Sequence, residues 1–211
     1  MNGIWMNIKN NIMVVLKWCS LILCLVSMAI FLTLNFSIIF VFFSHQEISG
    51  VTHGEILRDY GHLLLFLQVP GMHTINFQFI PISVSGKIHF SDVKQLILLN
   101  ELILIITGCL TYYEISRQKK KHQLWRLILP IKGLVVFIPT MMLILLINFN
   151  SWFIKFHELV FSNQDWIFNP TTDPIINVLT ENFFGLCVIA FTILIELMLG
   201  VLYYAGNRQL Y

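Results

Sequence analysis

The sequence predicts an all-α membrane protein in which four helices cross the bilayer. The 211 residues are 57% hydrophobic and only 11% charged, and their mean hydropathy of +0.77 is typical of a chain embedded in lipid. Four segments contain almost no charge over about 20 residues, the length that a helix needs to cross ~30 Å of hydrocarbon. Lysine and arginine, finally, gather at the chain ends and in the middle connection between these segments.

Each predicted transmembrane helix is an apolar run with at most two charged side chains, so we treat residues 1–211 as a single membrane domain. The four predicted helices are residues 18–43, 95–114, 127–150 and 182–205. They are joined by an outer segment at 44–94, an inner basic loop at 115–126 and a second outer segment at 151–181.

The distribution of charge predicts the orientation of the chain. Nine of the 13 lysines and arginines lie at the two chain ends, around the middle loop and at the start of the third helix. By the positive-inside rule, both termini are therefore expected in the cytoplasm, and both long outer segments outside the cell. The net charge of +2 comes from a separation of basic and acidic ends, which argues against a nucleic-acid partner.

The outer segments predict two small elements. Residues 73–90 read as a hairpin-like β element, because apolar and polar residues alternate and Ser85-Gly86 is a turn signal. Ser91 and Asp92 would then cap the second transmembrane helix. The aromatic-rich residues 152–161 predict a short amphipathic helix lying in the plane of the membrane interface.

The polar stretch from residue 156 to 173 is the most concentrated group of chemically active side chains in this apolar chain. It holds His157, Glu158, Asn163, Asp165 and Asp173 between two apolar runs that can each cross a membrane. An imidazole in an apolar interface near acids can act as a base at neutral pH. A lone histidine is also commonly structural, and Glu158 cannot orient its own neighbour, because adjacent helical side chains diverge by about 100°.

Two further groups are candidates on the first outer segment and the second helix. His89 and Asp92 are three residues apart and could share a face, although a surface histidine beside a helix cap is the alternative. Glu101 lies nine residues beyond Asp92, ~13 Å deeper along a helix. A carboxylate at that depth usually faces the bundle interior, so Glu101 is a candidate support.

No metal and no cofactor is expected. The histidines of the first outer segment (His45, His53, His62 and His73) match no ligand spacing. No P-loop, GxGxxG, GxSxG or HExxH motif occurs. These absences argue against a nucleotide enzyme, a serine hydrolase and a zinc protease.

Two short motifs carry a family resemblance. The run Phe156-His157-Glu158-Leu159 continues through Phe161, Asn163, Trp166, Pro170, Asp173 and Phe183-Phe184, and the other motif is His89-Phe90-Ser91-Asp92-Val93-Lys94. Together with the four-span layout, they resemble the lipoprotein intramolecular transacylase family of Gram-positive bacteria. The resemblance implies a cell-membrane enzyme that moves the sn-2 acyl chain of a diacylglyceryl-Cys lipoprotein to the α-amine of the same cysteine, giving a lyso-form lipoprotein.

The resemblance also implies roles for the candidate residues. His157 would be the general base, and His89 would stabilise the oxyanion or relay protons. Asp92 or Glu158 would orient an imidazole, and Asn163 and Asp173 would support the site, together with Glu101, which is a candidate support by its depth in the second helix. A covalent acyl-imidazole on His157 is the alternative mechanism. Alternative functions are another lipid hydrolase or acyltransferase at the membrane interface, or a non-catalytic membrane subunit that binds a partner through its outer loops.

Overall fold

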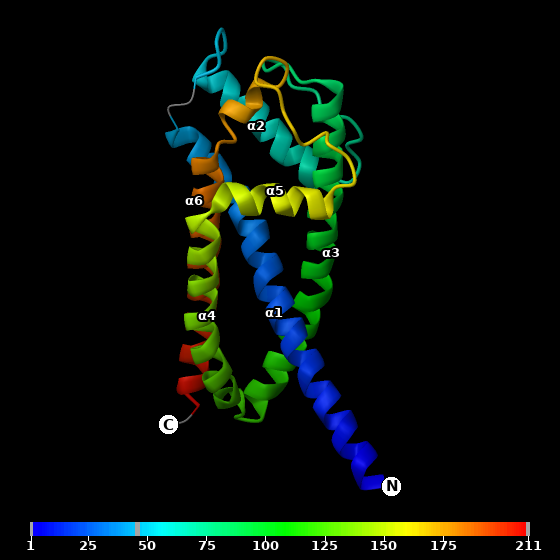
Figure 1. The fold of residues 1–211 in the computed structure, drawn as a ribbon. Coiled ribbons are helices and arrows are strands. Elements are labelled where there is room, and N and C mark those ends of the chain that lie inside the picture. The colour runs from blue at the N-terminus through cyan, green and yellow to red at the C-terminus, as the bar shows by residue number, and fades with distance from the viewer. Residues whose placement is uncertain (1, 45–46, 210–211) are drawn as a thin grey trace.

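The computed structural model describes residues 2–44 and 47–209, and in this part of the chain four helices are long and apolar enough to cross a membrane. They are α1 (Asn2–Phe43), α3 (Val84–Lys120), α4 (Ile128–Ile147) with the preceding 3₁₀ turn η1 (Leu124–Leu127), and α6 (Glu181–Asn207). The start of α1 and the end of α6 lie at the same end of the bundle (Figure 1). The all-helical fold with four membrane-length helices is therefore confirmed.

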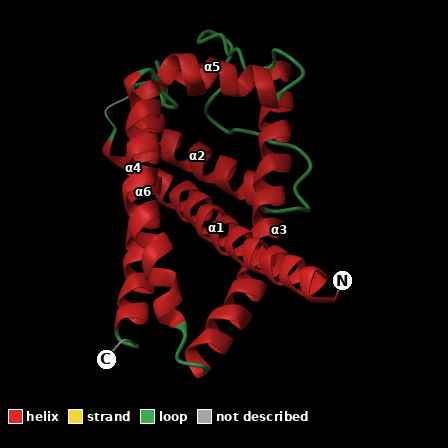
Figure 2. Cartoon of the chain, turned by 60° about the horizontal axis from the view of Figure 1, so that its bottom comes forward, coloured by secondary structure: helices red, strands yellow, loops and turns green. Residues whose placement is uncertain are grey.

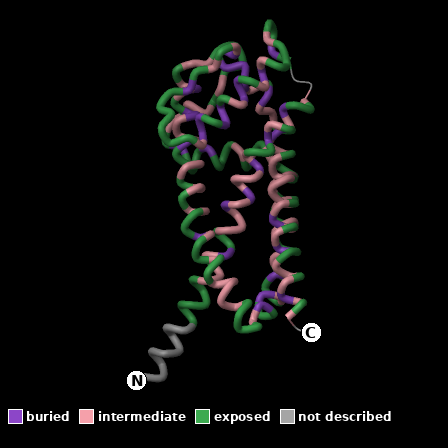
Figure 3. The backbone as a smooth tube through the Cα atoms, turned by 180° about the vertical axis from the view of Figure 1, so that it is seen from behind, coloured by how far each residue is buried: buried purple, intermediate pink, exposed green. Residues whose placement is uncertain are grey.

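The long helices pack as a bundle with one buried apolar cluster toward each end. α1 packs against α3 and α6, while α4 packs against α6 and η1. Buried apolar side chains form one cluster at the end that holds α2 and a second where η1 meets α1, α4 and α6. In Figure 3 the buried residues accordingly gather toward the two ends.

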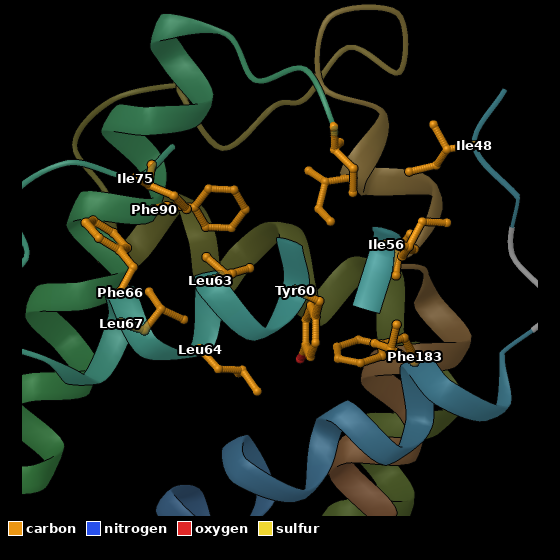
Figure 4. Packing of buried hydrophobic residues seen from close by; sticks show 14 residues of the cluster. Ile48, Ile56, Tyr60, Leu63, Leu64, Phe66, Leu67, Ile75, Phe90 and Phe183 are labelled. Carbon is orange, nitrogen blue, oxygen red and sulfur yellow. The ribbon is translucent and has the colours of Figure 1, made fainter. Parts of the chain in front are cut away.

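Two shorter helices cover the end of the bundle opposite the termini. α5 (Phe149–Val160) runs across the long helices (Figure 1), where the sequence predicts a short helix over residues 152–161. α2 (His53–Gln68) packs against α1 and α3, and its buried side chains form the centre of the cluster shown in Figure 4. The sequence analysis missed α2, although Thr52 and Glu55 form a capping box at its start.

The predicted β element at residues 73–90 is wrong. Residues 84–90 form the first turns of α3, and the described part of the chain has no strand (Figure 2). Its β pairing is limited to one isolated bridge between Ile48 and Val51. Ser83 is the N-cap of α3, accepting a hydrogen bond from the Gly86 N–H, so the predicted cap at Ser91 and Asp92 lies inside the helix. The alternating residues of this segment have no strand beside them to pair with. A two-stranded hairpin on its own is at best marginally stable, so the helix is favoured.

Buried charges hold the covering segments in place. The carboxylate of Asp59 is fully buried in α2 and accepts hydrogen bonds, each 2.8 Å long, from the backbone N–H groups of Gln78, Phe79 and Ile80. The Lys94 ammonium of α3 donates to the carbonyls of Phe66, Val69 and Met72 at the end of α2. Because buried charges are tolerated only when they are paired in this way, these contacts order the loop between α2 and α3.

Candidate active site

His157 lies on the third turn of α5 with only 8% of its surface exposed. Its Nδ1 is 2.7 Å from the backbone carbonyl oxygen of Phe153, one helical turn earlier. A carbonyl can only accept a hydrogen bond, so in the neutral ring Nδ1 carries the hydrogen. The lone pair is then on Nε2, the atom that can take up a proton.

His89 faces His157 from the second turn of α3. The two ring centroids are 5.8 Å apart, although 68 residues separate the histidines in sequence. His89 is 7% exposed, and its Nδ1 is buried without a hydrogen-bond partner among the described residues. An unpaired buried ring nitrogen is costly unless it has a functional partner. The structure thus brings together the two histidines of the predicted site.

Aromatic rings surround both imidazoles. The centroid of Phe153 is 4.0 Å from that of His157, and the centroid of Trp166 is 4.9 Å from it. Phe161 contacts both histidines, with centroids 5.0 Å from His89 and 5.5 Å from His157. These rings make the surroundings of both imidazoles apolar, and their faces can stabilise an imidazolium that forms during proton transfer.

This environment favours neutral histidines. Burial lowers the pKa of His157 below its usual 6.5, and the hydrogen bond to Phe153 opposes that shift only in part. A second proton on the neighbouring His89 would add like-charge repulsion at close range. At neutral pH, His157 is therefore held in the form that can act as a base.

Both histidines line a cavity of about 670 Å³ that extends between α1, α2, α3, α5 and α6, here called the histidine cavity. Its wall is almost entirely apolar. The polar exceptions include Thr33, Ser37, Tyr60 and Asn100. The Tyr60 hydroxyl lies 2.6 Å from Ser37 Oγ, and the Asn100 amide donates to the Ser27 carbonyl of α1. A cavity of this volume and lining suits an apolar ligand with few polar groups.

Asp92 and Asn163 connect the loop after α5 to α3. The Asn163 amide nitrogen donates to Asp92 Oδ2 at 2.9 Å, and the Asn163 side-chain oxygen accepts the Asp165 N–H. Asp92 is one turn from His89 on α3, but its carboxylate accepts a hydrogen bond from Asn163 and not from an imidazole. The pair positions the segment that carries Phe161 and Trp166 over the histidines.

Asp173 sits at the N-terminus of α3, where its carboxylate binds Ser83 and Thr172 and hydrogen-bonds neither imidazole. The Ser83 N–H donates to its Oδ1 at 2.7 Å, and the Thr172 hydroxyl donates to its Oδ2. A carboxylate is favourable at the positive end of a helix. A side chain at Gly86 would place a Cβ 2.6 Å from Asp173 Oδ1, so glycine is required for this close approach.

Two other predicted support residues are not brought to the histidines. Glu158 points to the exposed side of α5, and Glu101 is not among the residues that line the histidine cavity. Sequence reasoning missed the Phe153 carbonyl, which no side-chain pattern can reveal, and the cavity residues Tyr60 and Asn100. Asn100 had a usable signal, since a polar amide inside an apolar span usually faces the bundle interior.

The acidic, histidine and cysteine side chains of the described segments form no cluster of three or more with metal-binding geometry. The described lining of the histidine cavity combines two imidazoles with aromatic rings and a few hydroxyl and amide groups. This arrangement suits proton transfer on an apolar substrate.

This fold and site define an integral membrane protein with a histidine pair beside an apolar cavity. The family comparison is more specific: the family model described as lipoprotein intramolecular transacylase Lit matches residues 11–184. The chain belongs to this family of enzymes, which act on lipoproteins. Family membership therefore favours an enzyme over the non-catalytic membrane subunit.

Solved structures of Lit from Bacillus cereus, described as membrane integral, have the same fold. One is 24% identical to this chain, covers 97% of it and 96% of its own length, and has a TM-score of 0.84. A histidine-to-alanine variant of that enzyme is 22% identical, with coverage of 100% and 97% and a TM-score of 0.78. A comparison with curated proteins finds no match.

Proposed function

We propose that this enzyme transfers the sn-2 acyl chain of a diacylglyceryl-Cys lipoprotein to the α-amino group of the same cysteine. One observation carries the proposal: His157 donates through Nδ1 to the Phe153 carbonyl, which leaves Nε2 as the basic atom, and its ring centroid lies 5.8 Å from that of His89 on the wall of an apolar cavity. The lipoprotein specificity comes from family membership.

The reaction needs a proton carrier and no external energy source. The amine nitrogen attacks the ester carbonyl carbon, the new C–N bond forms, and the bond from that carbon to the sn-2 oxygen breaks. An α-amine with a pKa of about 8 must lose protons to react at pH 7. His157 Nε2 takes the proton from the attacking nitrogen and returns it to the departing glyceryl oxygen, so atoms and charges balance.

His89 acts on the same reacting centre. A neutral imidazole has one N–H donor, and a donor directed at the developing oxyanion stabilises the tetrahedral intermediate. Amine and ester belong to one molecule, so holding the acyl chain in the histidine cavity aligns two groups that are already tethered. The resulting amide is resonance-stabilised, which drives the transfer without a nucleotide.

The site faces the outside of a bacterial cell in this proposal. α5 and the loops around it form the end of the bundle opposite the basic loop, and the positive-inside rule places that loop in the cytoplasm. The same rule places both termini in the cytoplasm.

The test is tandem mass spectrometry of a reporter lipoprotein's N-terminal peptide, because acyl migration changes the position of the chain without changing mass. Cells with the wild-type enzyme should yield N-acylated lyso-form peptide, and His157→Gln should lower conversion roughly 10²–10⁴-fold. His62→Gln is the matched control, because His62 is exposed on α2 and outside the cavity. Wild-type conversion by His157→Gln, or release of free fatty acid in place of the amide, would overturn the proposal.

A further inference from the structure

A second cavity lies at the opposite end of α3 from the histidines. It measures about 580 Å³ and lies between α1, the last turns of α3 and η1; we call it the basic-end cavity. Its polar lining includes Lys17, Ser20, Thr111, Glu114, Arg117 and Gln118. Arg117 is 28 residues beyond His89 on the same helix, about 42 Å along its axis. That separation exceeds the ~30 Å thickness of a bilayer's hydrocarbon.

The side chains of this cavity have unused hydrogen-bonding capacity. Among residues with described side chains, seven polar side-chain atoms are buried without a partner, and four belong to residues that line this cavity. The four atoms are Ser20 Oγ, Thr111 Oγ1, Arg117 Nε and Gln118 Oε1. Buried polar groups are normally paired, so these four atoms can pair with a ligand once their side chains rotate toward the cavity.

The cavity also carries positive charge. Glu114 forms two ion pairs in the cavity: its carboxylate lies 3.2 Å from Lys17 Nζ and 2.9 Å from a terminal nitrogen of Arg117. The same carboxylate accepts a 3.1 Å hydrogen bond from Gln118 Nε2. Arg126 also lines the cavity. Three cations against one carboxylate leave a formal charge of +2, which one anionic group can reduce.

The rest of the lining is apolar and continues onto exposed surfaces. Met13, Val14 and Leu16 of α1 and Leu110 of α3 all line the cavity and are exposed. A small soluble anion would leave these side chains uncovered. A ligand with a charged head and hydrocarbon chains would satisfy the polar atoms and lie along the apolar ones.

We propose that the basic-end cavity binds an anionic phospholipid whose head group carries hydroxyls, as in phosphatidylglycerol. The unpaired Arg117 N–H and the two hydroxyls donate to the phosphate oxygens, and Gln118 Oε1 accepts from a head-group hydroxyl. The acyl chains follow the exposed apolar side chains of α1 and α3. The site is separate from the histidine cavity, so the proposal does not depend on the acyl-transfer reaction.

Lipid binding to the full-length, detergent-solubilised protein tests the proposal by native mass spectrometry. The probes are phosphatidylglycerol, phosphatidylcholine with the same acyl chains, and soluble glycerol phosphate. We expect phosphatidylglycerol to bind the wild type most tightly, and Arg117→Gln to weaken this binding roughly 10-fold or more. Lys120→Gln is the control, because it removes the same charge from an exposed neighbouring position.

Thr111→Val keeps the test decisive if Arg117→Gln does not fold. It removes an unpaired buried hydroxyl, so the lipid-free protein should melt at the same or a higher temperature, whereas phosphatidylglycerol should bind more weakly. Three results would overturn the proposal: undiminished phosphatidylglycerol binding by both variants, equally tight binding of phosphatidylcholine, or equally tight binding of glycerol phosphate. The last would assign the cavity to a soluble phosphate compound.

Discussion

At the scale of single residues, the base form of His157 depends on a backbone group and not on a carboxylate. The Phe153 carbonyl fixes the hydrogen on Nδ1, and the surrounding rings supply burial but no negative charge. In many histidine sites a carboxylate stabilises the imidazolium and raises its pKa. Here burial dominates and lowers the pKa of His157, so the ring stays neutral to a more acidic pH.

This lowered pKa has a stability consequence with a definite sign. Between the folded pKa and the unfolded value of 6.5, the unfolded chain binds more protons at this position, so the stability that neutral His157 contributes is complete above pH 6.5 and is lost as pH falls. We expect the Tm of the wild type to fall further than that of His157→Gln between pH 7.5 and pH 5. If the difference in Tm between wild type and His157→Gln were the same at both pH values, the lowered pKa of His157 would be contradicted.

His89 should be important without being the base. If it stabilises the oxyanion, His89→Ala should lower conversion of the reporter lipoprotein roughly 10²–10³-fold, the usual effect of losing one such donor. The measurement is again tandem mass spectrometry, with circular dichroism to show that the helices persist. His73→Ala, at an exposed loop position, serves as the control. Equal activity of the two variants would remove His89 from the mechanism.

At the scale of elements, the N-terminus of α3 decides where His89 lies. Ser83 caps the helix and Asp173 binds the cap's N–H group, so the loop before α6 holds the start of α3 in place. Asp173 therefore contacts the first turn of α3, the helix that carries His89. We propose that Asp173 supports the site in this way, through the start of α3.

Gly86→Ala should disrupt this attachment. The added Cβ would lie 2.6 Å from Asp173 Oδ1, and overpacking of this kind costs about 1–3 kcal/mol, or roughly 2–4 °C in Tm for each kcal/mol in a chain of this size. Gly108→Ala in the same helix is the control, because nothing lies within 4 Å of its added Cβ. The double variant Gly86→Ala/Asp173→Asn should lose less stability than the sum of the two single losses, because both substitutions disturb the same contact. If the decrease in Tm of the double variant equalled the sum of the two single decreases, Gly86 and Asp173 would act independently and this prediction would be wrong.

The elements differ in how well the sequence predicted them. The long apolar helices and α5 were recognisable because each is a continuous local pattern, although α3 begins at Val84, 11 residues before the predicted start at 95. Residues 84–90 show a strand-like alternation, but without a partner strand the Ser83 cap and the helix that follows prevail. α2 was missed although its capping box and its apolar residues at helical spacing were present in the sequence.

At the scale of the whole molecule, the proposal depends on which end of the bundle faces outward. In a variant with its native cysteines replaced, Gln164→Cys should react with a membrane-impermeant thiol reagent in intact cells, whereas Lys120→Cys should react only after permeabilisation. Both positions are exposed, so accessibility within the protein does not decide the outcome. Labelling of Lys120→Cys alone in intact cells would invert the orientation and place the histidines on the cytoplasmic side.

Hydropathy and the order of charges along the chain were enough to establish a four-helix membrane protein and to single out its histidine-bearing segments. These are local properties, since a bilayer selects each segment by its own apolar length and flanking charge. Only the folded chain shows that His89 and His157 face each other, that a backbone carbonyl sets the tautomer of His157, and that Asp173 holds the start of α3. Such pairings arise where separate segments fold over the end of the bundle, and no periodicity in the sequence encodes them.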